Sequence, residues 1–148
     1  MKQRFNLMVA ALWWGSLTTL GFLVVPMLFA NLGTPAVAGA MAAKLFTAQT
    51  WLSTGCAMLL LLILNKKDDV ALAQQAQAAM KFIVAGLLLA LLVEFGIAPR
   101  IVSARAEGGN LKLWHGLGTT LYVVQWFCAG LVLWRLSRPE PAADSAVT

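Results

Sequence analysis

The sequence predicts an all-α membrane protein, a bundle of four transmembrane helices with a short interfacial helix after the first. Hydrophobic residues make up 60% of the 148 positions and charged residues only 11%, against about 25% charged residues in soluble domains. A single domain of this length cannot bury so much apolar surface in its own core. We therefore expect one transmembrane domain over residues 1–138, followed by a disordered tail at 139–148 that is rich in proline and alanine.

The first span is expected over about residues 6–29. The run from Leu7 to Phe29 carries no charge, and its 23 residues would form a helix of about 34 Å, enough for a hydrocarbon core of about 30 Å. The run is also longer than the apolar region of a secretory signal, about 7–15 residues. It is therefore read as a retained helix, with Pro26 as the site of a kink.

The second span is expected over residues 46–64. A turn at 31–35, with Asn, Gly and Pro, precedes an alanine-rich stretch at 35–44, which we interpret as the short interfacial helix. The charged segment at 65–69 ends the second span, because its side chains cannot enter hydrocarbon.

The third and fourth spans are expected over residues 79–98 and 113–136. Alanine and glutamine at 70–79, which are strong helix formers, would extend the third helix into water. Pro99 is expected to end that helix, and residues 100–110 are expected to form a short charged loop. No long internal repeat and no second domain are expected.

The basic residues predict the orientation. Four spans place both termini on one side of the membrane. By the positive-inside rule, both termini then lie in the cytoplasm of a bacterium, with the protein in the inner membrane. Seven Lys and Arg fall on the terminal side (Lys2, Arg4, Lys66, Lys67, Lys81, Arg135, Arg138) and four on the other (Lys44, Arg100, Arg105, Lys112).

The net charge of +5 does not indicate nucleic acid. The basic residues flank the apolar runs, where anionic headgroups attract them, so the lipid bilayer is the expected partner. A homo-oligomer or a larger membrane complex stays open. Cys56 and Cys128 both lie inside apolar runs and are expected to remain unpaired thiols, and no metal-binding cysteine spacing is present.

Each apolar run carries a stripe of small or polar residues at helical spacing. Such stripes serve either as ordinary helix packing or as the wall of a polar cavity at the outer end of the bundle, and both interpretations stay open. The candidate site residues are Glu94 and His115, with Arg100, Gln49 and Tyr122 as possible neighbours.

Glu94 and His115 are the leading pair. Glu94 is the one carboxylate inside an apolar run and His115 the one histidine, and on an antiparallel hairpin they would lie at similar depth. An ionised carboxylate in hydrocarbon costs on the order of 3 kcal/mol. Glu94 could form a structural ion pair with Arg100 or His115. Alternatively, the pair could transfer protons, hold a metal or contact a substrate. One His and one Glu are too few ligands to assign a metal.

No catalytic residue is assigned. The sequence has no glycine-rich phosphate loop, nucleophile elbow or catalytic triad, and an enzyme is not the favoured interpretation.

Short motifs resemble one membrane family. They are Leu12-Trp-Trp-Gly-Ser, Val25-Pro-Met-Leu-Phe, Lys44-Leu-Phe, Glu94 with Pro99-Arg-Ile, and Trp114-His-Gly. Over residues 5–136 the chain is similar to the transmembrane protein 205-like family, whose bacterial members carry a domain of unknown function. The resemblance implies a four-helix membrane protein linked to resistance to platinum drugs and to export. Transport or tolerance of toxic compounds is therefore the leading function, and the molecular activity is unassigned.

A more distant resemblance is to the membrane haem-binding protoporphyrinogen oxidase family and the copper-resistance membrane domain. These are small bundles whose first helix contains Trp, Gly and Pro. The oxidase family has Phe-His where this chain has Phe5-Asn6, so the early haem ligand is missing. Haem or copper binding in a redox protein is the alternative function, and an accessory subunit of a larger membrane complex is the third.

Overall fold

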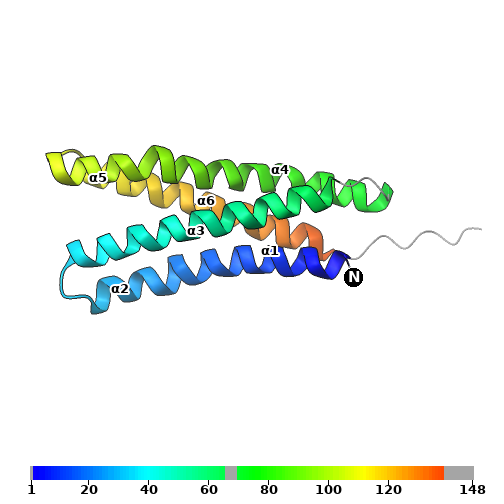
Figure 1. The fold of residues 1–148 in the computed structure, drawn as a ribbon, viewed down its shortest axis with the longest axis horizontal. Helices are drawn as coiled ribbons and strands as arrows, with labels where there is room; N and C mark the ends of the chain where they lie inside the picture. Colours follow the sequence, from blue (N-terminus) through cyan, green and yellow to red (C-terminus); the bar gives the residue numbers. More distant parts are fainter. Residues whose placement is uncertain (1, 66–69, 139–148) are drawn as a thin grey trace, which may run out of the picture.

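Four long helices make up nearly all of the described chain, and they run alongside one another (Figure 1). The computed structural model describes residues 2–65 and 70–138, and within these it contains helices and no strand. The segments in chain order are α1 (Lys2–Thr19), η1 (Leu20–Val24), α2 (Val25–Asn31), α3 (Pro35–Leu64), α4 (Val70–Leu92), η2 (Val93–Ile97), α5 (Ala98–Glu107) and α6 (Leu111–Ser137). The segments η1 and η2 are π-helical.

The predicted fold class is confirmed. The described chain has four helices that are long and apolar enough to cross a membrane: Gln3–Asn31, Pro35–Leu64, Gln77–Glu107 and Leu111–Ser137. The first joins α1, η1 and α2, and the third joins most of α4 with η2 and α5. Large apolar side chains are exposed along all four helices, as expected where lipid is the solvent.

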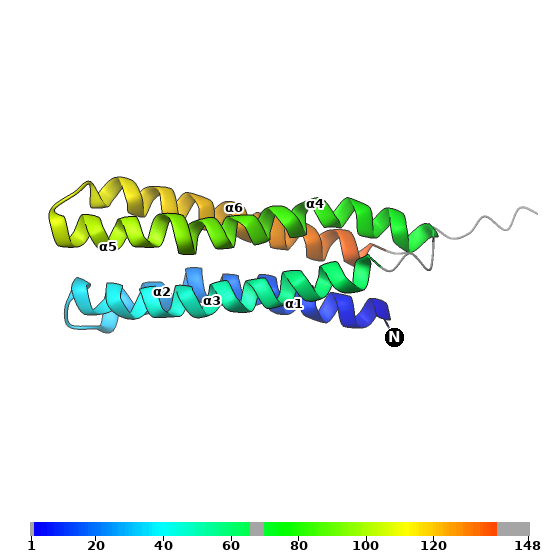
Figure 2. The ribbon, with the colours of Figure 1, turned by 45° about the horizontal axis from the view of Figure 1, so that its top comes forward.

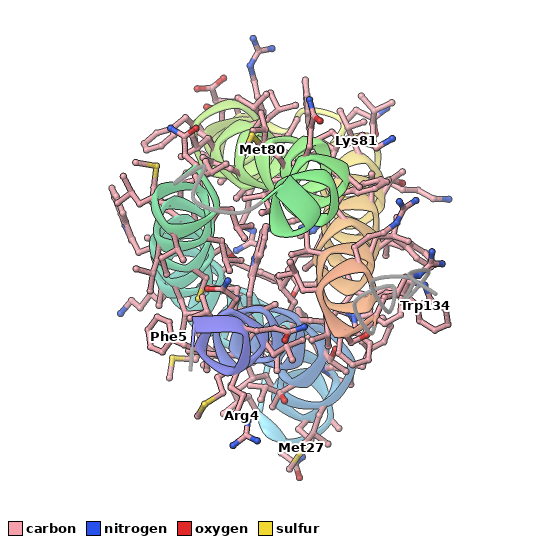
Figure 3. All side chains as sticks on the ribbon, turned by 90° about the vertical axis from the view of Figure 1, so that its right-hand side faces the viewer. Arg4, Phe5, Met27, Met80, Lys81 and Trp134 are labelled. Atoms are coloured by element: carbon pink, nitrogen blue, oxygen red, sulfur yellow. The ribbon has the colours of Figure 1, made fainter. Side chains whose placement is uncertain are left out.

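The helices form two hairpins that pack side by side. The first hairpin (residues 2–65) contains α1 to α3, and the second (residues 70–138) contains α4 to α6; Figure 2 shows them as two layers. Both α1 and α4 pack against α3 and α6, so the four helices form a ring. Seen along the bundle, Arg4, Lys81 and Trp134 lie on its periphery (Figure 3). We call the end with Gln3, Leu64 and Ser137 the amino-terminal end, and the opposite end the distal end.

The apolar core lies in the half of the bundle nearer the amino-terminal end. Its centre is Trp13, which is fully buried and packs with residues from all four helices, among them Leu60, Ile83 and Val132. Gly86 of α4 makes room for the indole: a Cβ at that position would lie 2.9 Å from Trp13 Cη2. Most of the buried polar side chains, namely Gln49, Thr50, Ser53 and Gln125, lie nearer the middle of the bundle, whereas Asn6 lies near the amino-terminal end.

The stretch at 35–44 is not a separate interfacial helix, contrary to the prediction. It forms the first turns of α3, which runs unbroken from Pro35 to Leu64. Thr34 caps this helix by accepting a hydrogen bond from the Val37 backbone N–H at 3.3 Å. The predicted boundary between the interfacial helix and the second span, at residues 44–46, contains no glycine or proline. No helix-breaking residue therefore ends the helix there.

Pro99 does not end the third helix, which is a second correction. The helix continues as α5 to Glu107 and ends at Gly108, whose φ of 75° is the left-handed conformation that glycine adopts most easily. The predicted charged loop at 100–110 is therefore mostly helix. The helix continues past the proline because the preceding turn, η2, is widened. There the Ala98 N–H donates to the Val93 carbonyl, five residues earlier. Pro99 itself has no N–H to donate.

The interruption that the sequence placed at Pro26 has the same form. The Val25 N–H bonds the carbonyl of Leu20, and in both helices the proline is the second residue after the π-helical segment. A π-helical turn is one of the known ways in which a helix accommodates such a break.

The two hairpins correspond in the register of their helix interruptions and of several buried positions, and we call this correspondence the hairpin repeat. Adding 73 to the numbers of the first helix aligns it with the third and places Pro26 on Pro99 and Phe22 on Phe95, the two identical pairs between residues 3–31 and 76–104. Adding 72 to the numbers of α3 gives α6, and the segments Cys56-Ala-Met-Leu-Leu-Leu and Cys128-Ala-Gly-Leu-Val-Leu share four of six residues. The burial pattern follows the same offsets, with buried residues at 10 and 83, 13 and 86, 17 and 90, 53 and 125, 56 and 128, 57 and 129, and 60 and 132.

Cys56 and Cys128 are free and buried, as predicted. The predicted disordered tail at 139–148 and the charges at 66–69 lie outside the described residues.

The contact between Gly86 and Trp13 gives a test of the core. Gly86→Ala should lower the free energy of unfolding in detergent by about 1–3 kcal/mol, because the new methyl group overpacks a fully buried indole. Gly55→Ala is the matched control, since a Cβ there meets nothing within 4 Å; it should be neutral or stabilising by up to about 1 kcal/mol. Equal effects of both changes on thermal unfolding would contradict the packing described.

Candidate functional site

A set of polar contacts lies near mid-height in the bundle, next to both π-helical segments. Glu94 precedes the end of α5 at Glu107 by 13 residues, Thr47 follows the start of α3 by 12, and Tyr122 follows the start of α6 by 11. At 1.5 Å per residue, these positions agree to within about 3 Å in height. We call Gly21, Thr47, Glu94 and Tyr122 the middle layer.

Glu94 is half-buried in η2 and is held by a hydroxyl from the neighbouring hairpin. Thr47 Oγ1 donates to Glu94 Oε1 at 2.8 Å. A neutral hydroxyl orients a carboxylate but does not neutralise it. Within residues 2–65 and 70–138, the structure records no protein partner for the second carboxylate oxygen, Oε2, and no ion pair of Glu94.

Glu94 and His115 are not brought together. His115 lies four residues from the start of α6, whereas Glu94 lies 13 from the end of α5, so the two differ in height by about 13 Å. The expected match in depth assumed that the helix ends at Pro99, and the continuation of α5 removes it. The His115 side chain is exposed, near the distal end.

Arg100 does not pair with Glu94 either. Its guanidinium lies over the Trp114 ring, 5.2 Å from the ring centroid, in a cation–π contact that ties α5 to α6. The structural ion pair considered from the sequence, between Glu94 and Arg100 or His115, is thus not formed among the described residues.

Gln49 joins the two helices of the first hairpin. It is buried, and its Nε2 donates to Ser16 Oγ of α1 at 2.9 Å and to Ser53 Oγ of its own helix at 3.3 Å. Ser16 Oγ in turn donates to the Trp13 carbonyl at 2.9 Å. Interhelical contacts of this kind are ordinary packing in membranes, and the recorded hydrogen bonds of Gln49 lie within the first hairpin.

Tyr122 inserts its hydroxyl into the first interrupted helix. The hydroxyl donates to the Leu17 carbonyl at 2.8 Å, and the Gly21 backbone N–H faces the same oxygen. In an unbroken α-helix Leu17 and Gly21 would bond each other directly. The ring lies so close that a Cβ on Gly21 would be 2.7 Å from Tyr122 Cε1, and Phe46 packs edge-on at 5.2 Å between ring centroids.

Two contacts were missed from the sequence. Thr47 had no signal beyond being a hydroxyl in an apolar run, two residues before Gln49. The second is Trp126, whose Nε1 donates to Thr18 Oγ1 at 2.8 Å, while that hydroxyl donates to the Trp14 carbonyl at 2.8 Å. Indole N–H groups need an acceptor when buried, so a hydroxyl at matching depth was the available clue.

The donor set does not favour a transition metal or haem. In the part of the chain that the structure describes, no three His, Cys, Asp or Glu side chains lie close enough to hold a metal ion. What the middle layer offers is one half-buried carboxylate, with the Thr47 hydroxyl on one of its oxygens.

These features define the class of protein: a multi-pass α-helical membrane protein with a carboxylate at mid-height. Residues 8–110 match the family described as a domain of unknown function (DUF4149). This match covers well over half of the 148 residues, and the chain belongs to that family. No curated protein and no solved structure matches it.

The hydroxyl of Tyr122 can be tested by Tyr122→Phe. The change leaves the Leu17 carbonyl and the Gly21 N–H without their partner, so the free energy of unfolding in detergent should fall by about 1 kcal/mol. Thr120→Val is the control, because the exposed Thr120 hydroxyl bonds only Gly116 of its own helix; its effect should stay within about 0.5 kcal/mol. A Tyr122→Phe protein as stable as the parent would show that the hydroxyl does not hold η1.

Proposed function

We propose that this chain is a small membrane transport protein of the toxic-compound tolerance kind, in which Glu94 is the group that binds and releases its charge partner. One observation carries the proposal: a half-buried carboxylate stands at an interruption of a spanning helix, with a hydroxyl as its recorded partner. Ionisable groups at such depth mark ion and substrate pathways in membrane proteins.

The energetics of Glu94 support this role. An ionised carboxylate at mid-height is unfavourable by on the order of 3 kcal/mol, and the Thr47 hydroxyl supplies no positive charge. Protonation or a bound cation would remove that cost. Neutralised by a proton or a cation from outside the chain, Glu94 changes its charge each time that partner binds or leaves. Transport requires such a change.

The resemblance to the transmembrane protein 205-like family agrees with this function, since its members are linked to drug resistance and export. Four of its motif segments, from Leu12 to Pro99-Arg-Ile, lie within the stretch that matches the unknown-function family. The haem or copper alternative has less support, because Asn6 stands where the oxidase family has histidine and no three-ligand cluster occurs among the described residues. The remaining alternative, an accessory subunit or homo-oligomer, would appear as a larger assembly in native mass spectrometry.

We further propose that the protein lies in a bacterial inner membrane with the amino-terminal end of the bundle in the cytoplasm, on the charge bias of seven to four. A cysteine introduced at Gly109, in the distal turn, should then react with a membrane-impermeant thiol reagent added to intact cells. A cysteine at residue 67 should react only after lysis. The buried native thiols provide the background control, and the reverse pattern would overturn the orientation.

The role of Glu94 can be tested by Glu94→Gln, which keeps the shape and removes the charge. We expect loss of tolerance in a complemented deletion strain challenged with a panel of toxic compounds, with normal membrane insertion and thermal stability. Glu107→Gln, which removes an exposed carboxylate at the distal end, is the matched control and should retain full tolerance. His115→Asn should also retain it, because His115 is remote from Glu94. Full tolerance in Glu94→Gln would reject the function.

A further inference from the structure

We propose that a monovalent alkali metal cation binds at Glu94 in η2, at the one of the two corresponding helix interruptions that carries a carboxylate. This inference rests on the proposed transport function and names the ion that its site would take. It is carried by the comparison of the two hairpins, position by position.

The repeat places the two interruptions in register. The segments η1 and η2 each contain five residues, and the offset of 73 places Gly21 on Glu94 and Pro26 on Pro99. Where the two halves of a transporter each carry an interrupted helix at corresponding positions, the substrate or ion site lies there, and unwound backbone carbonyls coordinate the ion.

Each interruption leaves a backbone carbonyl without its usual donors. The Ala98 N–H is directed to Val93 instead of to Glu94, and the next possible donor, residue 99, is a proline with no N–H. The main-chain carbonyl of Glu94 therefore loses both helical partners. The main-chain carbonyl of Gly21 likewise has neither helical donor, because the Val25 N–H bonds Leu20 and residue 26 is proline.

An aromatic side chain packs against the first interruption. Tyr122 places its ring against Gly21 and its hydroxyl on the Leu17 carbonyl. The offset of 72 places Thr50 of α3 at the position of Tyr122. Threonine has no aromatic ring, and at the second interruption it is the Glu94 carboxylate that contacts the neighbouring hairpin, at Thr47 Oγ1.

Three kinds of oxygen atom occur at the second interruption. Glu94 Oε2 has no recorded protein partner among the described residues, the main-chain carbonyl of Glu94 has no helical donor, and Thr47 Oγ1 lies 2.8 Å from Oε1. Carboxylate, carbonyl and hydroxyl oxygens suit hard cations rather than transition metals, in agreement with the lack of a three-residue His, Cys, Asp or Glu cluster in the described chain.

The charge selects a monovalent ion. Glu94 contributes one negative charge, and within the described ranges it has no ion pair; Arg100, six residues further on, lies over Trp114. A monovalent cation would make the site neutral. A divalent cation would leave an uncompensated positive charge at mid-height, which hydrocarbon disfavours by several kcal/mol.

The test measures binding without requiring transport. The full chain in detergent is unfolded thermally in sodium, potassium or lithium chloride, with choline chloride at equal ionic strength as reference. A cation that binds the folded state raises the unfolding midpoint as its concentration increases. We expect a rise with at least one alkali cation, its loss in Glu94→Gln, a weaker rise in Thr47→Val, and an unchanged rise in Glu107→Gln.

A second variant tests the comparison of the hairpins. Thr50→Tyr combined with Glu94→Gly copies the first interruption into the second, and it should insert and unfold cooperatively without any response to alkali cations. A midpoint that no alkali chloride raises in the parent protein, or a rise that persists in Glu94→Gln, would overturn the inference. If Glu94→Gln loses tolerance but the parent protein shows no alkali response, the cation site is rejected and the proposed function stands with a proton as the partner of Glu94. If the parent protein shows the alkali response but Glu94→Gln keeps full tolerance, the cation site stands and the proposed function is rejected.

Discussion

The cost of leaving a backbone polar group unpaired inside hydrocarbon shapes this structure. An unpaired N–H or C=O there costs several kcal/mol, and Pro26 and Pro99 each remove a donor from a spanning helix. The chain responds in the same way twice, by widening the preceding turn into a π-helical segment. The helices therefore continue to the distal end, which sets their length and places Glu94 at mid-height.

This constraint also explains how the bundle divides. In the half nearer the amino-terminal end, the backbone is regular and the helices can approach over small residues such as Gly86 and Ala129, with Trp13 filling the centre. Around the interruptions the geometry is less regular, and side-chain hydroxyls supply the contacts: Tyr122 to the Leu17 carbonyl and Thr47 to Glu94. The apolar half holds the helices together, whereas in the middle layer the two hairpins differ in chemistry, with Gly21 in one and Glu94 in the other.

The fold could be read from the sequence because hydropathy over some 20 residues is a long-range average that single residues barely disturb. The helix ends could not be predicted in the same way. Proline commonly ends a helix in water, whereas in lipid a broken helix would leave backbone groups unpaired, which costs more than a π-helical turn. That single misreading at Pro99 moved Glu94 toward the surface and paired it with His115. Glu94 was recognised correctly as the unusual charge, but its partner Thr47 was not, since a lone hydroxyl carries no pattern. The repeat was missed because its strongest part, Cys56-Ala57 against Cys128-Ala129, is short and lies in ordinary apolar sequence.

The hairpin repeat has a consequence for how the two halves lie in the membrane. A unit with an even number of spans returns to the side from which it started, so the two hairpins have the same orientation. Because both hairpins belong to one polypeptide, corresponding positions can hold different residues. Gly21 lies under the Tyr122 ring, whereas Glu94 at the corresponding position is a carboxylate held by Thr47, a difference that two identical molecules could not make.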